Sequence, residues 1–156
     1  MILGLEREVS MNTPQEKHKE IVRHIHDQVN KGNTEVFYEH LSPDNARHCQ
    51  AMPPEFQEIT GIEPLVQFVK QHIAAFPDWE DVIDYIIAEG NRVAYQTTST
   101  GTQTGQMGPF PATGKSVRLM SLISHRFENE KIVETWITWD NLAFLTQLGH
   151  LPSTPG

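Results

Sequence analysis

The spacing of apolar residues changes near Trp79, and this change constrains the fold more than any other feature of the sequence. Before Trp79, apolar side chains recur every three or four residues, as they do along one face of a helix. After it, β-branched and aromatic residues dominate, and turn residues divide them as they divide hairpins. The pattern predicts helices in the first half of the chain and an antiparallel sheet in the second, which is an α+β fold.

Three helices are expected before Trp79. The first follows the capping box at residues 13–16, which has proline in the first turn, and ends at Gly32 after an apolar stripe of Ile21, Ile25 and Val29. A short second helix is predicted over residues 34–41, before a turn at residues 42–44. The third begins after Gly61 and ends near Pro77, with the period carried by Leu65, Val69, Ile73 and Phe76.

Four strands are expected after Trp79, at residues 82–88, 92–102, 117–127 and 131–139. Gly90-Asn91 and Asn129-Glu130 are the turns of two hairpins, and a loop rich in glycine and proline joins the hairpins. Asp140 and Asn141 can cap a last helix that reaches Leu148. The expected order is three helices, four strands and one helix.

Length and charge limit the function. With 156 residues the chain suits one domain, at residues 13–150, between a flexible extension at residues 1–12 and a flexible tail at residues 151–156. The formal net charge is −8 without a basic cluster, which argues against nucleic acid as a partner. Apolar runs are too short to cross a membrane, and Cys49 is the only cysteine, so a cytoplasmic protein is expected.

Several stretches in order resemble the SnoaL-like polyketide cyclase family, a branch of the nuclear-transport-factor-2-like superfamily. Residues 75–79 (AFPDW) are similar to the family's A-F-P-D turn, and residues 88–93 (AEGNRV) to its A-E-G-D-R-V hairpin. Residues 101–105 (GTQTG) resemble G-T-H-T-G, and residues 111–115 (PATGK) continue that pattern. Residues 126–136 (RFENEKIVETW) match R-F-x-D-G-K-I-V-E-x-W, and 147–149 (QLG) close the match.

This resemblance implies a cone-shaped α+β barrel, in which a curved antiparallel sheet packs on three N-terminal helices around an apolar pocket. It also implies a homodimer formed through the sheet. Such cyclases use an aspartate as acid and base, assisted by a histidine on the neighbouring strand, and need no cofactor. Counting from Lys131 and from Gln147 places the aspartate position at Ile137, and the histidine position falls at Ile123. Isoleucine cannot move a proton, so that mechanism is not expected here.

Strand alternation indicates what else faces the interior. If Ile123 and Ile137 line the cone, then Ser121, His125, Phe127, Val133, Thr135 and Trp139 share their face. The opposite face carries Arg126, Glu134, Ile132 and Trp136, where Arg126 and Glu134 can pair across strands. We expect the homodimer contact on that opposite face, around Trp136 and Ile132.

Three residues are the candidate catalytic groups. His125 can act as a general base on an apolar sheet face, although a core histidine bonded to a neighbour is the alternative. His48 matches a histidine common at the mouth of the cone in the family, and Tyr95 can offer a phenol to an oxyanion. The candidate substrate-binding residues are Ile123, Phe127, Ile137, Trp139 and Thr135. No histidine and carboxylate set has convincing metal spacing, so no metal is expected.

The sequence favours a cofactor-free enzyme that moves a proton on a small apolar or polycyclic ligand, as a cyclase, isomerase, dehydratase or hydrolase does. The alternative is a small-ligand binding protein of the same fold without turnover. Loss of the aspartate and histidine pair favours the binder, whereas His125, His48 and Tyr95 favour the enzyme.

Overall fold

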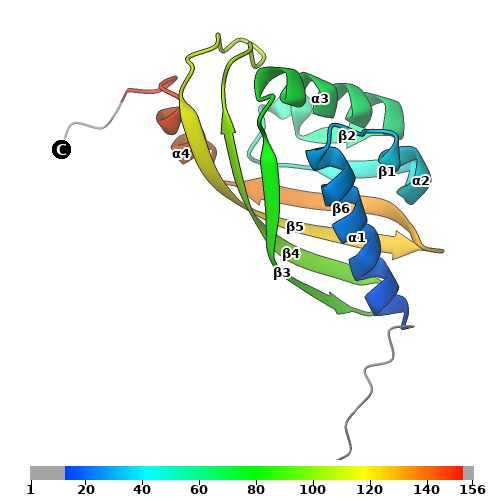
Figure 1. The fold of residues 1–156 in the computed structure, drawn as a ribbon. Coiled ribbons are helices and arrows are strands. Elements are labelled where there is room, and N and C mark those ends of the chain that lie inside the picture. The colour runs from blue at the N-terminus through cyan, green and yellow to red at the C-terminus, as the bar shows by residue number, and fades with distance from the viewer. Residues whose placement is uncertain (1–12, 153–156) are drawn as a thin grey trace, which may run out of the picture.

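The computed structural model describes residues 13–152 and contains four α-helices and one six-stranded sheet in that range (Figure 1). The helices are α1 (Pro14–Asn30), α2 (Val36–His40), α3 (Ile62–Ala75) and α4 (Asn141–Gln147), with a short 3₁₀ turn at Pro54–Phe56. The strands are β1 (Leu41–His48), β2 (Glu58–Thr60), β3 (Glu80–Glu89), β4 (Arg92–Thr102), β5 (Ser116–Glu128) and β6 (Lys131–Trp139). The flexibility expected at residues 1–12 and 153–156 lies outside the described residues.

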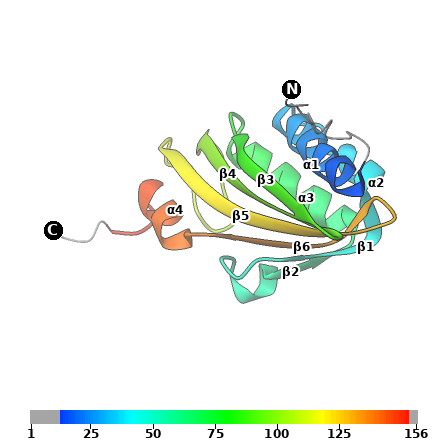
Figure 2. The same ribbon diagram turned by 90° about the horizontal axis from the view of Figure 1, so that it is seen from below.

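The sheet is curved and unclosed, and α1 and α3 lie on its concave side (Figures 1 and 2). Its strand order is β2-β1-β6-β5-β4-β3. Neighbouring strands are antiparallel except β1 and β6, which run parallel. The α+β cone expected from the sequence is therefore confirmed, and no helix of the described range is long and apolar enough to span a membrane.

The region after α2 corrects one expectation. Residues 41–48 form β1 rather than a helix end and a turn, and β2 was not expected at all. Pro43 is accommodated because the pairing of β1 with β6 is irregular between Leu41 and Ala46. β1 pairs in parallel with β6, about ninety residues later, and a parallel pair is not joined by a tight turn. The sequence around β1 therefore contains no turn signal that would indicate a strand.

A β-bulge corrects a second expectation. The register of β5 and β6 shifts between Arg126 and Phe127, so that Arg126 lies opposite Glu134 while Phe127 lies opposite Ile132. The extra residue, Val133, borders a small groove with Arg126 and Glu134 on the outer face. Ile132 is instead 1% exposed and packs in the core. The bulge thus reverses the expected faces of Ile132 and Val133.

Two apolar clusters lie on the concave side. The larger joins α1, α2 and α3 to the strands and includes Val22, Phe37, Leu65, Phe127 and Ile132. The smaller lies near α4 and includes Phe76, Leu119, Phe144 and Leu148. Thr97 and Ser121 are buried register partners, and they lie between Tyr95 and Ile123 of the larger cluster on one side and Leu119 of the smaller cluster on the other. Polar side chains therefore occur within the interior as well as around it.

Candidate functional site

A row of hydrogen-bonded side chains crosses the interior from β3 to β6. The hydroxyl of Tyr95 is 2.8 Å from Nε2 of His26 and 2.8 Å from Nε2 of His125. Nδ1 of His125 is 2.7 Å from Oγ1 of Thr135, and Nδ1 of His26 is 3.5 Å from Oδ2 of Asp81. We call Asp81, His26, Tyr95, His125 and Thr135 the interior relay.

Helix and strand periodicity explain why the side chains of the interior relay point to the interior. His26 lies one helical turn after Val22, which is 0% exposed, so it shares the face of α1 that packs on the sheet. His125 and Thr135 are opposite each other on β5 and β6, and opposite residues in a sheet point to the same side. Tyr95 on β4 lies opposite Ile123, one inward position away from His125.

The hydroxyl of Tyr95 has one proton and therefore donates to only one of its two imidazole neighbours. The Asp81 carboxylate favours a proton on Nδ1 of His26, which leaves Nε2 of His26 to accept from Tyr95. Nε2–H of His125 then donates to the Tyr95 oxygen, and the Thr135 hydroxyl donates to Nδ1 of His125. If Nε2 of His26 gains a proton, the donors from His26 Nε2 to Thr135 reverse while Nδ1–H of His26 still donates to Asp81, so the interior relay has two self-consistent states.

Burial sets the charges along the interior relay. Burial and, to a smaller extent, the neighbouring His26 together lower the pKa of His125 to about 3, so His125 is neutral near pH 7. Burial also raises the pKa of Tyr95 well above its usual range, and the Asp81 charge adds to this. Burial opposes ionisation of Asp81, yet hydrogen bonds from His26, Ser99 and Trp79 hold its pKa below the ordinary value. Asp81 is therefore the fixed negative charge of the interior.

Arg47 and His72 lie on the α3 side of the same interior. Arg47, on β1, is 8% exposed, and its Cζ lies 4.9 Å from the ring centroid of Phe68 on α3. Its Nη1 is buried without a hydrogen-bond partner among residues 13–152. His72 is one turn after Phe68, and its pKa is lowered to about 4, mainly by burial, with smaller opposing effects of Asp81, which raises it, and Arg47, which lowers it.

The structure brings several predicted residues together. His125, Tyr95 and Thr135 belong to the interior relay, and Ile123 lies opposite Ile137 on the same concave face. Ile123 is 6% exposed and Ile137 is partly buried against the larger cluster. The two isoleucines thus form an apolar floor beside the relay.

Other predicted residues lie elsewhere. Phe127 is 2% exposed and stacks on the His18 ring with centroids 4.1 Å apart, so it packs in the core. Trp139 packs against the smaller cluster, and its Nε1 donates to Asn141. His48 lies on the outer face, where Nε2 is 2.9 Å from a Glu134 oxygen. Each assigned role stays a prediction, but His48 and the interior relay are on opposite sides of the sheet.

Glu134 also forms the expected pair with Arg126, whose Nη2 is 3.1 Å from Oε2. The His48 ring stacks near Trp136 beside this pair, with centroids 5.4 Å apart. These contacts make a polar cluster on the outer face. The cross-strand pair of Arg126 and Glu134 that the sequence predicted is therefore present.

Sequence reasoning missed His26, Asp81, Arg47 and His72. A signal for His26 was present, because His18, Val22 and His26 follow one another at four-residue spacing beside the predicted apolar stripe of the first helix. Arg47 gave no signal, since β1 was not recognised. Asp81 precedes the expected start of its strand by one residue, so strand alternation did not indicate the side to which it points.

An open groove of about 690 Å³ lies on the outer face of the sheet. Its lining includes Tyr85, Ile87, Leu122, Trp136 and Thr138, together with His48. Tyr95, Ile123 and Ile137 also border it, through their strand backbones, because their side chains point to the concave side. This groove is not the apolar pocket expected inside the cone, which stays a prediction.

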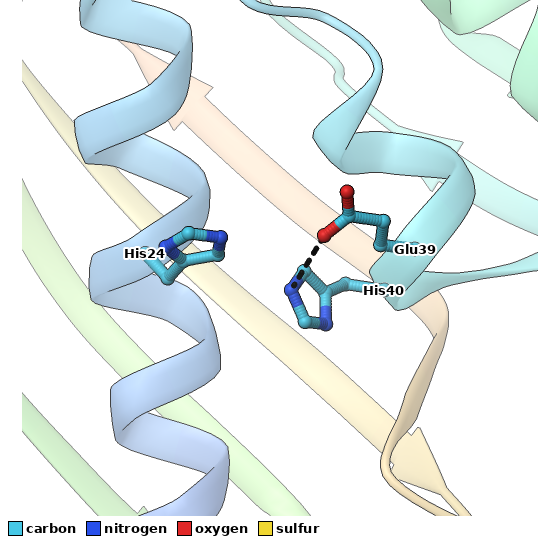
Figure 3. Close-up of side chains that lie close together, drawn as sticks. All are labelled: His24, Glu39 and His40. Carbon is cyan, nitrogen blue, oxygen red and sulfur yellow. Dashed lines mark ion pairs between the residues drawn. The ribbon is translucent and has the colours of Figure 1, made fainter.

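His24, Glu39 and His40 come together on the surface between α1 and α2 (Figure 3). One potential ligand atom of each lies within 4.8 Å of the others, a grouping that could hold a divalent ion. The spacing analysis missed it because the residues belong to two helices. Lys131 counts against it, since its ammonium donates to the Glu39 carbonyl and helps to lower the pKa of His40 after burial and His24. The expectation of no metal stays a prediction.

The curved sheet with helices on its concave side and a polar interior defines a protein of the nuclear-transport-factor-2-like cone fold. The sequence profile of the SnoaL-like polyketide cyclase family matches residues 19–148, and the chain belongs to this family. Among curated proteins, none matches the chain.

Solved structures agree with this assignment. A candidate SnoaL-like polyketide cyclase from Jannaschia sp. CCS1 has a TM-score of 0.80 at 23% identity, over 90% of this chain and 97% of its own. AclR from Streptomyces galilaeus, named a candidate hydroxylase, has a TM-score of 0.76 at 27% identity, over 89% of this chain and 85% of its own. IdmH from Streptomyces antibioticus, a candidate polyketide cyclase, has a TM-score of 0.72 at 26% identity, over 85% of this chain and 98% of its own. The first shows a shared fold, and the other two share that fold under different named activities, a hydroxylase and a polyketide cyclase.

Proposed function

We propose that this protein is a cofactor-free enzyme that transfers a proton on a small apolar or polycyclic carbonyl compound, as a cyclase or isomerase does. One observation carries the proposal: the hydroxyl of Tyr95 is held between two imidazoles, one of which lies beside a carboxylate. A phenol fixed in this way is a ready donor to an oxygen that becomes negative during reaction.

The charges divide the roles between the two histidines. Nδ1 of His26 lies 3.5 Å from Oδ2 of Asp81, whereas burial lowers the pKa of His125 to about 3 and disfavours an imidazolium there. When a substrate carbonyl replaces Nε2 of His26 as the acceptor of the Tyr95 hydroxyl, Nε2 is free to remove the proton alpha to that carbonyl, and Tyr95 donates to the enolate oxygen that forms. The oxygen and the alpha carbon of a ketone are two bonds apart, so two groups in hydrogen-bond contact can reach both. His125, which the sequence favoured as the base, orients Tyr95.

A binding protein without turnover is the second candidate. It is favoured by the apolar floor, because Ile123 and Ile137 occupy the two positions where the resemblance places the cyclase histidine and aspartate. In that case the interior relay would only orient a carbonyl ligand.

Exchange of the alpha protons of 2-tetralone into D₂O, followed by NMR, tests the enzyme. Tyr95→Phe and His26→Gln should each reduce exchange by about a hundredfold, the usual scale for general acid and base groups. His24→Gln is the matched control, because His24 is an exposed residue of the same helix. Binding of 2-tetralone without exchange above the buffer rate would favour the binding protein.

The outer sheet face supports a further part of the proposal, a homodimer. Val82, Tyr85, Ile87, Met120 and Leu122 are between 48% and 61% exposed on β3 and β5. Leu122→Glu should give a monomer in sedimentation, while Leu142→Glu, at an exposed leucine of α4, should not. Ile132, which the sequence placed in this contact, is buried and takes no part.

A cytoplasmic location fits the single buried thiol of Cys49.

A further inference from the structure

The guanidinium of Arg47 is a buried cation without a counterion in the described part of the chain. No carboxylate of residues 13–152 forms an ion pair with it, and its Nη1 has no hydrogen-bond partner there. Burial lowers its pKa, and the Cys49 thiol, which opposes this, is a weak partner. The Phe68 ring attracts the cation but satisfies none of its N–H donors.

Proteins rarely leave such a group unpaired, because removing a charge from water is costly unless another charge and good hydrogen bonds compensate. The packing around Arg47 holds this side chain in place: it sits under α3, in contact with Phe68, on a strand paired on both sides. The structure therefore holds the Arg47 guanidinium in place as a hydrogen-bond donor, and its acceptor has to come from a bound molecule.

The position of Arg47 links it to the interior relay. Arg47 lies opposite Thr135 in the parallel pairing of β1 and β6, and Thr135 contacts His125. His72, which feels the charges of both Arg47 and Asp81, lies on the α3 side of the same interior. A molecule resting on Ile123 and Ile137 would thus meet Tyr95 at one end and Arg47 at the other.

We propose that Arg47 binds a carboxylate of the ligand, so that the ligand class is an apolar, ring-containing carboxylic acid. A planar guanidinium matches a carboxylate with two parallel hydrogen bonds, and a buried site strengthens them. The inference rests on the proposed function, because both require a ligand to enter the interior. It deepens that function by assigning Arg47 to the end of the ligand that lies away from the reacting carbon.

The test compares 2-naphthoate with 2-naphthamide, which have similar shapes and differ in charge. Calorimetry on the full chain should show naphthoate binding about tenfold or more tightly than naphthamide. Arg47→Met should reduce this ratio to about one. Arg118→Met is the control at an exposed arginine and should keep the ratio. The ligand-free Arg47→Met protein should melt at or above the wild-type temperature, because it no longer buries an unpaired charge.

Three results would overturn the inference: equal binding of the two probes, no naphthoate binding at millimolar concentration, or a lower melting temperature of ligand-free Arg47→Met, which would make Arg47 structural. Tyr95→Phe separates this inference from the proposed function, because it should reduce exchange of 2-tetralone about a hundredfold and leave the preference for naphthoate intact. A wild-type protein that prefers naphthoate but exchanges no 2-tetralone proton would refute the enzyme and retain the Arg47 site.

Discussion

Acid should destabilise this protein well above the pH at which carboxylates titrate, because two partly buried histidines, His125 and His72, stay neutral in the folded state. The pKa of His125 is about 3 and that of His72 about 4, against 6.5 for an unfolded histidine. Below pH 6.5 the unfolded chain binds two protons that the folded chain does not. The free energy of unfolding therefore falls as the pH decreases from 6.5 toward 4, and it is unaffected by these groups above pH 7.5.

The size of the effect follows from the same values. At pH 5 the unfolded pKa is 1.5 units away, so each histidine costs about 2 kcal/mol relative to pH 7.5, and the pair costs about 4 kcal/mol. This is a large share of the stability of a domain of this size. Asp81 does not offset the loss, because its lowered pKa keeps it charged at pH 5.

Urea unfolding at pH 7.5, 6 and 5 measures the loss for the wild type and for His125→Gln, His72→Gln and His24→Gln. Each buried variant should lose about 2 kcal/mol less than the wild type between pH 7.5 and 5, whatever its stability at pH 7.5. His24→Gln should behave as the wild type, since His24 is exposed. A wild-type pH dependence in His125→Gln would refute the assignment of a neutral buried imidazole on β5.

Three further changes test the packing by urea unfolding. Gly105→Ala should cost about 2 kcal/mol, because a Cβ there would lie 2.5 Å from the backbone oxygen of Ala74; an unchanged stability would contradict that close approach. Asp140→Ala should cost about 1 kcal/mol by removing the cap hydrogen bond at the start of α4, and no loss would mean that the cap is replaced by water. Ile137→Asp should cost about 2 kcal/mol or more, since a carboxylate would enter an apolar floor; an unchanged melting temperature would show that this position is wet.

The hairpins and the first helix were predictable because their signals are local. Gly90-Asn91 and Asn129-Glu130 form tight turns with positive φ at Gly90, Asn129 and Glu130, and Thr13 caps α1 as the capping box indicated. Neither β1 nor the bulge beside Phe127 could be found in this way. β1 depends on a partner strand far along the chain, and a bulge changes which residues face inward without changing the run of apolar letters.

The residues of the candidate site also differ in whether local sequence signals could predict them. Tyr95 and His125 came from strand alternation, which a hairpin preserves over several residues. His26 and Arg47 reach the interior from α1 and β1, whose placement depends on tertiary packing. The two groups to which we assign proton removal and carboxylate binding were therefore the ones that sequence periodicity did not find.

The parallel pairing of β1 with β6 has a consequence for the order in which the protein folds. β3, β4, β5 and β6 pair with their sequence neighbours, so this meander can form from short-range contacts. β1 cannot dock until β6 exists, which requires closing a loop of about ninety residues. During synthesis the segment that carries Arg47 leaves the ribosome before β6 and is among the last to reach its native place, so the interior that holds Arg47 and Tyr95 is complete only once β6 has been released.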